Sequence, residues 1–393
     1  MEASHEDRIG GIGARTDPGF YLTREPATLA MLLLLAVVSF LAVVGLSRIY
    51  HGQQQALGDR WFRRGLADLQ GHQWERATSE FRTALLYSRD NYTYQLNLAG
   101  ALLGLKRSNE AYAYLINLWE REPENGLVNL ELARIAAQKG ETEQALRYYH
   151  NAIYAIWPSN QEIARRDARL ELVEFLLGIR ANTQAQSELI ALAANLPDDP
   201  SQHQRAGDLF LRAQDYEHAL VEYRLTLRAD RHNPSANAGA GVAAFELGRY
   251  PLAQRYLQVA VSANPSDAQA AEVLKTTELV LEMDPARRQI SSEQRNRIVT
   301  EAFVVAGQRL KSCVAVGAST AAAAREPTQP TLTQRWATLQ RQISERGLRR
   351  NPDLVEEAMD LVFEIERQTN SACASPTGKD LALLLLAKEH EGN

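Results

Sequence analysis

The sequence predicts an all-α fold in three parts: an N-terminal transmembrane helix, an array of repeated helices and a small C-terminal helical bundle. Three observations predict this fold. They are twenty uncharged residues at 27–46, an alanine that recurs mostly every 34 residues, and helix start and stop signals after Pro285. With 45% apolar and 23% charged residues over 393 positions, the chain has a globular composition and enough apolar residues for a large core.

Composition and charge exclude several classes of function. A formal net charge of -5 gives no basic surface for nucleic acid, so no nucleic-acid partner is expected. Two cysteines exclude a disulfide-rich scaffold and a four-thiolate zinc site, and the eight histidines show no metal-ligand spacing. We therefore expect no metal and no cofactor. Only six of the 43 basic residues are lysine, which favours a bacterial genome rich in G and C.

Residues 1–26 are expected to form a flexible tail and residues 27–47 a transmembrane helix. The run ATLAMLLLLAVVSFLAVVGL has no charge and spans about 30 Å at 1.5 Å per residue, the thickness of a bilayer's hydrocarbon core. A buried core helix and a cleavable signal peptide are the alternatives. Against a signal peptide, the apolar run is long, and Arg8, Arg15 and Arg24 are offset by five acidic residues.

The positive-inside rule barely distinguishes the two orientations of this span, because the numbers of basic residues on its two sides are nearly equal. Three arginines precede the span, and four follow it: Arg48, Arg60, Arg63 and Arg64. We favour a single-pass protein of the bacterial inner membrane with its bulk in the periplasm, because the tail is short and two cysteines suit an oxidising compartment.

The repeat runs from residue 59 to residue 265. Its alanines are Ala77, Ala111, Ala145, Ala185, Ala219 and Ala253, with spacings of 34, 34, 40, 34 and 34 residues. A small or compact residue precedes each alanine by twelve positions, namely Gly65, Ala99, Ala133, Val173, Gly207 and Gly241. A large apolar residue follows it by four, namely Phe81, Leu115, Tyr149, Leu189, Tyr223 and Leu257. The six extra residues before the fourth unit predict a lengthened helix or loop.

The segments GAGVAAFELGRYPLAQRYLQVAVSANP and GLVNLELARIAAQKGETEQALRYYHNAIY resemble the tetratricopeptide repeat (TPR) family, whose unit is two antiparallel helices in 34 residues. The layout resembles that of bacterial single-span TPR proteins. The resemblance implies an α-solenoid of about six helix pairs with a closing helix at 59–284. Because small residues let helix backbones approach, we expect Gly241 to face Ala253, and Ala260 to face the next unit.

The resemblance also implies a concave groove, lined by the first helix of each pair, that takes a segment of another protein. Reading inward positions by analogy gives Arg63, Leu66, Asn97, Arg134, Gln138, Glu174, Asp208 and Arg212. Only Asn97 matches the clamp with which some family members hold a terminal carboxylate. For each of these residues, a solvated helix face is the alternative.

Aromatic residues gather in the first half of the repeats. Tyr92, Tyr112 and Trp119 are candidates for a partner contact, since such rings bury much area at little entropic cost. Their alternative role is to fill the core.

Residues 286–393 are expected to form a helical domain with a linker near 317–331 and helices at Leu332–Glu345, Pro352–Gln368 and Lys379–Glu389. Residues 286–350 carry twelve basic and four acidic residues, and residues 351–393 carry three basic and nine acidic. Charge balance within the domain is one explanation, and contact of 286–350 with anionic lipid is the other. In an exported domain we predict a disulfide between Cys313 and Cys373, worth about 4 kcal/mol in the chain-entropy model.

These features predict a non-enzymatic, membrane-tethered TPR scaffold that holds a segment of another protein during envelope assembly, secretion or complex maturation. No nucleophile, base and orienting group can be nominated from spacing. The alternatives are a permanent structural subunit of a membrane complex and an enzyme with its site in the C-terminal helical domain.

Overall fold

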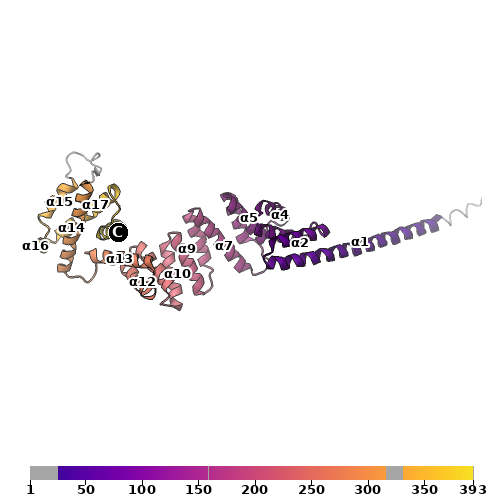
Figure 1. Cartoon of the computed structure of the whole chain (residues 1–393), viewed down its shortest axis with the longest axis horizontal. Helices are drawn as coiled ribbons and strands as arrows, with labels where there is room; N and C mark the ends of the chain where they lie inside the picture. The colour runs from indigo at the N-terminus through magenta and orange to yellow at the C-terminus, as the bar shows by residue number, and fades with distance from the viewer. Residues whose placement is uncertain (1–24, 158, 316–330, 393) are drawn as a thin grey trace, which may run out of the picture. The chain divides into compact units, whose positions relative to one another are not determined.

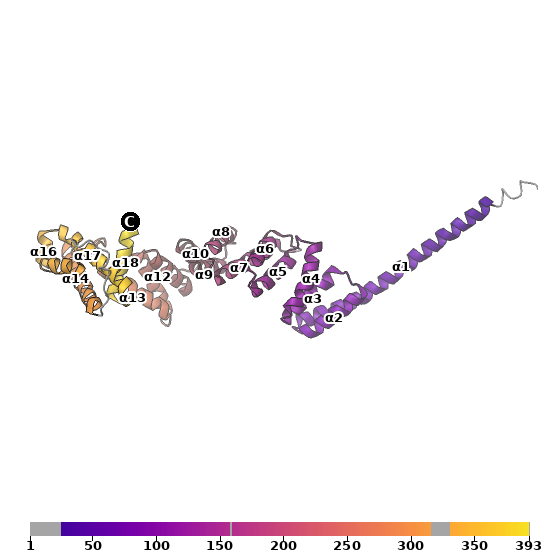
Figure 2. The ribbon, with the colours of Figure 1, turned by 90° about the horizontal axis from the view of Figure 1, so that it is seen from above.

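The computed structural model describes residues 25–157, 159–315 and 331–392 of the chain. These residues form α-helices and no strand, so the predicted all-α fold is confirmed for the part described. They divide into two compact units, residues 1–161 and 162–393 (Figures 1 and 2). The predicted linker, apart from Thr331, and residues 1–24 of the predicted tail lie outside the described residues.

The helices of the first unit are α1 (Glu25–Gln70), α2 (Trp74–Tyr87), α3 (Tyr92–Gly104), α4 (Ser108–Arg121), α5 (Gly126–Lys139) and α6 (Thr142–Tyr154). The repeats of the second unit are α7 (Gln161–Gly178), α8 (Asn182–Ala193), α9 (Pro200–Arg212), α10 (Tyr216–Ala229), α11 (Pro234–Glu246) and α12 (Tyr250–Ala263). The C-terminal part holds α13 (Ala268–Met283), α14 (Ser292–Ala315), α15 (Leu332–Gln340), α16 (Glu345–Arg350), α17 (Asp353–Ala372) and α18 (Lys379–Gly392).

The apolar span and the first repeat helix are one continuous helix, α1, of 46 residues (Figure 1). Residues 28–46 include the apolar stretch, and α1 is the one described helix long and apolar enough to cross a bilayer. The connecting segment, SRIYHGQQQALG, contains no proline and is rich in residues of good helix propensity. Gly58 is the first buried residue of α1, and from there the helix packs against α2.

In three of the helix pairs, a large side chain of the second helix lies against a glycine of the first. A Cβ added to Gly65 would lie 2.6 Å from the Phe81 ring, and one added to Gly207 would lie 2.9 Å from the Tyr223 ring. All six recurring alanines are fully buried. The repeat pattern therefore marks the places where paired helices come closest.

Tyr223 also connects neighbouring pairs, because its ring covers Gly239 of α11 as well as Gly207 of α9. At Gly241 the nearest neighbour is Leu257. An added Cβ would lie 2.6 Å from its Cγ, so Leu257 lies closer to Gly241 than the expected Ala253 does. The reason is that the larger side chain, four residues further along α12, reaches across to the glycine.

The C-terminal helices share one apolar core with the end of the repeats. This core runs from Tyr250 of α12 through Val280 of α13 to Trp336, Val362 and Leu383 of the bundle. The helix predicted at Leu332–Glu345 ends early, at Gln340, and α16 begins at Glu345. Ser344 causes the new start, because its side chain accepts a hydrogen bond from the Gly347 N–H.

A disulfide and a half-buried arginine hold the connection between α17 and α18. Cys313 of α14 is bonded to Cys373, and their Cα atoms are 5.8 Å apart. One turn earlier on α14, Arg309 donates from Nε to Thr369 Oγ1 at 2.8 Å and from Nη2 to the Ala374 carbonyl at 2.9 Å. The turn after α17 is therefore fixed at adjacent residues by a covalent and a polar contact.

Arg309 Nε also lies 3.2 Å from Oε2 of Glu366, which is fully buried on α17. The pKa of Glu366 is raised to about 8, first by burial and then by the nearby Asp380 carboxylate, while Arg309 opposes the shift. Because burial is the largest cause, Glu366 is mainly protonated at neutral pH.

The glycine contacts predict opposite effects for one substitution at two sites. Gly241→Ala should lower local stability by about 1 to 3 kcal/mol, because the added Cβ meets Leu257. Gly100→Ala should raise it by about 0.5 to 1 kcal/mol, because nothing lies within 4 Å of its added Cβ. Amide hydrogen exchange in α11 and α3 measures both. Equal effects at the two sites would contradict the close-contact explanation.

The disulfide predicts that the unreduced, denatured protein contains no reactive thiol among its two cysteines. Thiol titration checks this result, and two titratable thiols in exported protein would refute the bond. Cys313→Ser should lower the free energy of unfolding of the C-terminal helices by about 2 to 4 kcal/mol.

The raised pKa of Glu366 predicts a pH dependence of stability. Between the unfolded pKa of 4.5 and the folded value of about 8, the folded state binds more protons. The contribution of Glu366 to the free energy of unfolding is therefore complete below pH 4.5 and is lost as the pH rises through about 8. The free energy of unfolding falls over this range by at most about 1.4 kcal/mol per pH unit. Denaturation across this range should show the slope in wild type and a smaller one in Glu366→Gln. Equal slopes would show that Glu366 titrates normally.

Candidate functional site

The predicted groove residues all lie on first helices of the pairs and are half-buried or exposed. In unit 1 the four polar ones each make a polar contact within the unit. Arg63 Nε donates to the Asp59 carbonyl at 3.3 Å, Asn97 Nδ2 donates to the Thr93 carbonyl at 2.8 Å, Arg134 pairs with Glu131 at 2.7 Å, and Gln138 Oε1 accepts from Ser108 Oγ at 3.3 Å. These contacts orient the side chains without joining the four residues to one another.

In unit 2, two predicted groove residues come together. Arg212 of α9 pairs with Glu174 of α7 at 2.8 Å, which links neighbouring first helices. The side chains are 53% and 43% exposed, so the pair contributes about 0 to 1 kcal/mol and remains accessible to a partner.

Asp208, the third predicted groove residue of unit 2, is held in place by a tyrosine of the second helix in its pair. It accepts a hydrogen bond from the Tyr223 hydroxyl at 2.7 Å. Burial and then this carboxylate raise the pKa of Tyr223, so the hydroxyl stays protonated and donates. Sequence reasoning assigned Tyr223 to packing only. The fifteen-residue separation between Asp208 and Tyr223 gave no signal for this second role.

The three candidate aromatic residues are half-buried and contact their own chain. Lys139 Nζ lies 4.7 Å from the Tyr112 ring centroid, and Arg121 lies over Tyr92 at 5.6 Å. Trp119 makes an edge contact with Tyr148, with ring centroids 6.2 Å apart. Contact of these rings with a partner stays a prediction.

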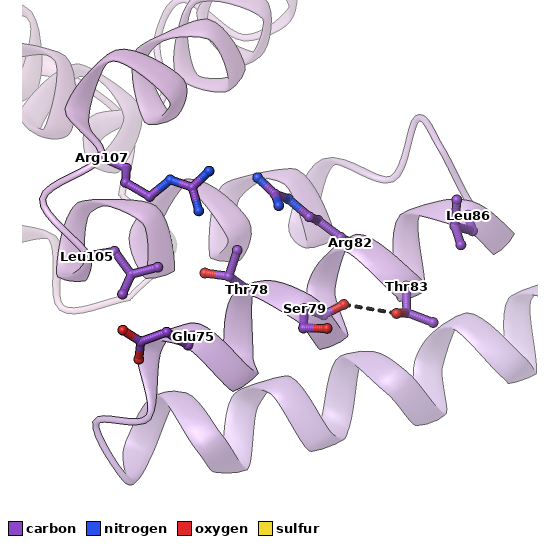
Figure 3. Close-up of a pocket in the computed structure, with 8 residues that line it drawn as sticks. All are labelled: Glu75, Thr78, Ser79, Arg82, Thr83, Leu86, Leu105 and Arg107. Atoms are coloured by element: carbon purple, nitrogen blue, oxygen red, sulfur yellow. Dashed lines mark hydrogen bonds between the residues drawn. The ribbon is translucent and has the colours of Figure 1, made fainter.

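A hollow of about 340 Å³ lies on α2 beside the turn that follows α3 (Figure 3). Thr78 and Ser79 lie along it, and Arg82 and Arg107 extend toward one another across one side. Both guanidinium groups already share Glu110, at 3.0 Å and 2.5 Å. The hollow therefore offers little free positive charge to a ligand.

Metal ligands are not assembled anywhere in residues 25–157, 159–315 and 331–392, where no group of three or more His, Cys, Asp or Glu side chains could hold an ion.

Comparison with known proteins gives one family match. The tetratricopeptide repeat model matches residues 204–268, which run from within α9 to the first residue of α13. The chain matches no curated protein sequence.

Several solved structures are similar to the chain. A crystal structure of YrrB, described as a TPR protein with an unusual peptide-binding site, is 16% identical with a TM-score of 0.39, and covers 49% of this chain and 96% of its own. Pseudomonas aeruginosa PilF is 17% identical with a TM-score of 0.40, covering 56% and 97%. PilW, described as a widely conserved type IV pilus biogenesis factor, is 15% identical with a TM-score of 0.40, covering 55% and 98%.

These TM-scores are below 0.5, so the likeness says nothing of this chain's partner. The match identifies tetratricopeptide repeat sequence at residues 204–268, and the helix pairs that precede this segment support a tetratricopeptide repeat protein.

Proposed function

We propose that the chain is a non-enzymatic scaffold, tethered by one span in the bacterial inner membrane, whose repeats bind a segment of another protein in the periplasm. The segment would be held during envelope assembly, secretion or complex maturation. The observation that carries the proposal is the single helix α1, because it contains both the apolar span and the first repeat helix.

The form of α1 supports a scaffold that acts close to the membrane. Between the end of the apolar run at Leu46 and the first buried residue, Gly58, lie eleven residues, or about 17 Å of helix. A helical connection transmits position and orientation, whereas a Gly and Ser linker would not. The first helix pair would therefore meet proteins that are themselves in or near the bilayer.

The side chains on the first helices support binding of a protein segment. They include both signs of charge, with Arg63, Arg134 and Arg212 against Glu174 and Asp208. Such a surface can make polar contacts along an extended chain, while stacked helix pairs supply a firm base for it.

Contact of residues 286–350 with anionic lipid is a secondary proposal. An ion pair within the bundle joins the basic part to the acidic part, between Arg335 and Glu364 at 2.6 Å. This pairing favours charge balance within the domain as one reason for the uneven charge of residues 286–350 and 351–393. Association of the full chain with anionic and neutral vesicles across a salt series compares the two explanations.

Photo-crosslinking in the native membrane tests the scaffold function. A photoreactive residue in place of Asn97 or Asp208 should crosslink a defined protein in sub-stoichiometric yield. The same residue in place of Arg147 or Arg224, which are exposed on second helices, is the matched control and should not. Equal crosslinking from both sets, with stoichiometric copurification, would instead favour a permanent subunit.

A C-terminal reporter fusion tests the location. Export-dependent reporter activity is expected, and activity of a cytoplasmic reporter would place the repeats on the other side of the membrane.

A further inference from the structure

Unit 2 also has a hollow, and its lining differs from that of the hollow in Figure 3. It encloses about 240 Å³ between α7, α8 and α9. Leu170, Leu192 and Leu196 give it an apolar lining, while Arg166, Asp167 and Arg205 contribute the charged groups. It thus combines an aliphatic surface with two cationic side chains and one anionic side chain.

The two guanidinium groups have no partner within the described part of the chain: neither Arg166 nor Arg205 makes a hydrogen bond or an ion pair there. Neighbouring polar groups are already engaged, because Ser201 Oγ donates to Asp199 at 2.8 Å and the same carboxylate caps α9. In the hollow on α2, by contrast, both arginines pair with Glu110. Of these two hollows, the one between α7, α8 and α9 is the one that combines an apolar lining with a pair of arginines that lack an anion.

The longer α7 makes the position of Arg166 favourable. Residue 166 is nineteen positions before its repeat alanine, where Pro200 and Pro234 begin α9 and α11. An arginine at a first helical position would face the positive end of the helix dipole. The extra residues start α7 at Gln161 instead, so Arg166 lies more than one turn inside the helix.

We propose that this hollow binds an acidic side chain of the partner segment, with aliphatic residues beside it. The carboxylate would lie between Arg166 and Arg205, since guanidinium and carboxylate groups form strong, directional pairs. The aliphatic neighbours would cover Leu170, Leu192 and Leu196. Asp167 repels a second acidic group, so one carboxylate flanked by aliphatic residues fits best. The inference rests on the proposed function and specifies the chemistry of its partner.

Peptide titration of the full chain in lipid nanodiscs tests this proposal. The probes are N-acetyl-Leu-Glu-Leu-amide and its neutral match, N-acetyl-Leu-Gln-Leu-amide. Methyl NMR of leucine-labelled protein should show saturable shifts at Leu170, Leu192 and Leu196 with the Glu peptide only. Added salt should weaken this binding, because the attraction is between charged groups.

The variant Arg166→Gln with Arg205→Gln should bind the Glu peptide about tenfold or more weakly. Arg224→Gln with Arg228→Gln removes the same charge from exposed positions of α10 and should bind as wild type does. No saturable shift, equal binding of the two peptides, or an unchanged affinity in the first variant would overturn the proposal. If photoreactive residues at positions 97 and 208 still crosslink a defined protein, such a result would overturn this proposal and not the scaffold function.

Discussion

The structure depends on one type of contact, in which a large side chain of a second helix lies directly on the backbone of the first. Gly65, Gly207 and Gly241 allow it, because a Cβ at these positions would collide with Phe81, Tyr223 or Leu257. The gain from this burial offsets the conformational cost of glycine inside a helix, about 0.5 to 1 kcal/mol. With the paired face filled in this way, the polar side chains of each first helix are left on other faces. That division of faces separates residues that build the repeats from residues that can meet a partner.

The continuity of α1 couples this packing to the membrane. Tyr94 of α3 donates a hydrogen bond to Asp59 of α1 at 2.5 Å, and the Tyr94 ring stacks on Phe62 with centroids 4.8 Å apart. The helix that carries the apolar span is therefore also part of the packed interior of unit 1. A force or displacement on the span would reach these contacts through a helical rod, which is stiffer than a flexible linker.

The sequence alone was sufficient to predict the structural features that recur from repeat to repeat. Burial of the six recurring alanines and the all-α fold follow from periodicity, because each repeat meets the same packing demand. The α7–α9 hollow could not be predicted in this way, since Arg166, Leu192 and Arg205 come from three helices and a departure from the period. The link between Tyr223 and Asp208 was also missed, because a tyrosine at a packing position carries no sign that its hydroxyl has a partner.

The C-terminal bundle solves the problem that any solenoid has at its end, where the last pair exposes an apolar face. A polar closing helix would have been enough for solubility, but the last turns of α13 are themselves packed on one face, where Val280 and Met283 have no exposed surface. The bundle covers that helix, and α18 reaches back so that Glu389 lies 3.8 Å from a Cβ position at Gly248, beside the last pair. The disulfide at Cys373 and the Arg309 contacts at Ala374 fix the turn from which α18 starts. Loss of these contacts would free α18 and expose part of the core that contains Tyr250, so the end of the repeats and the bundle should unfold together.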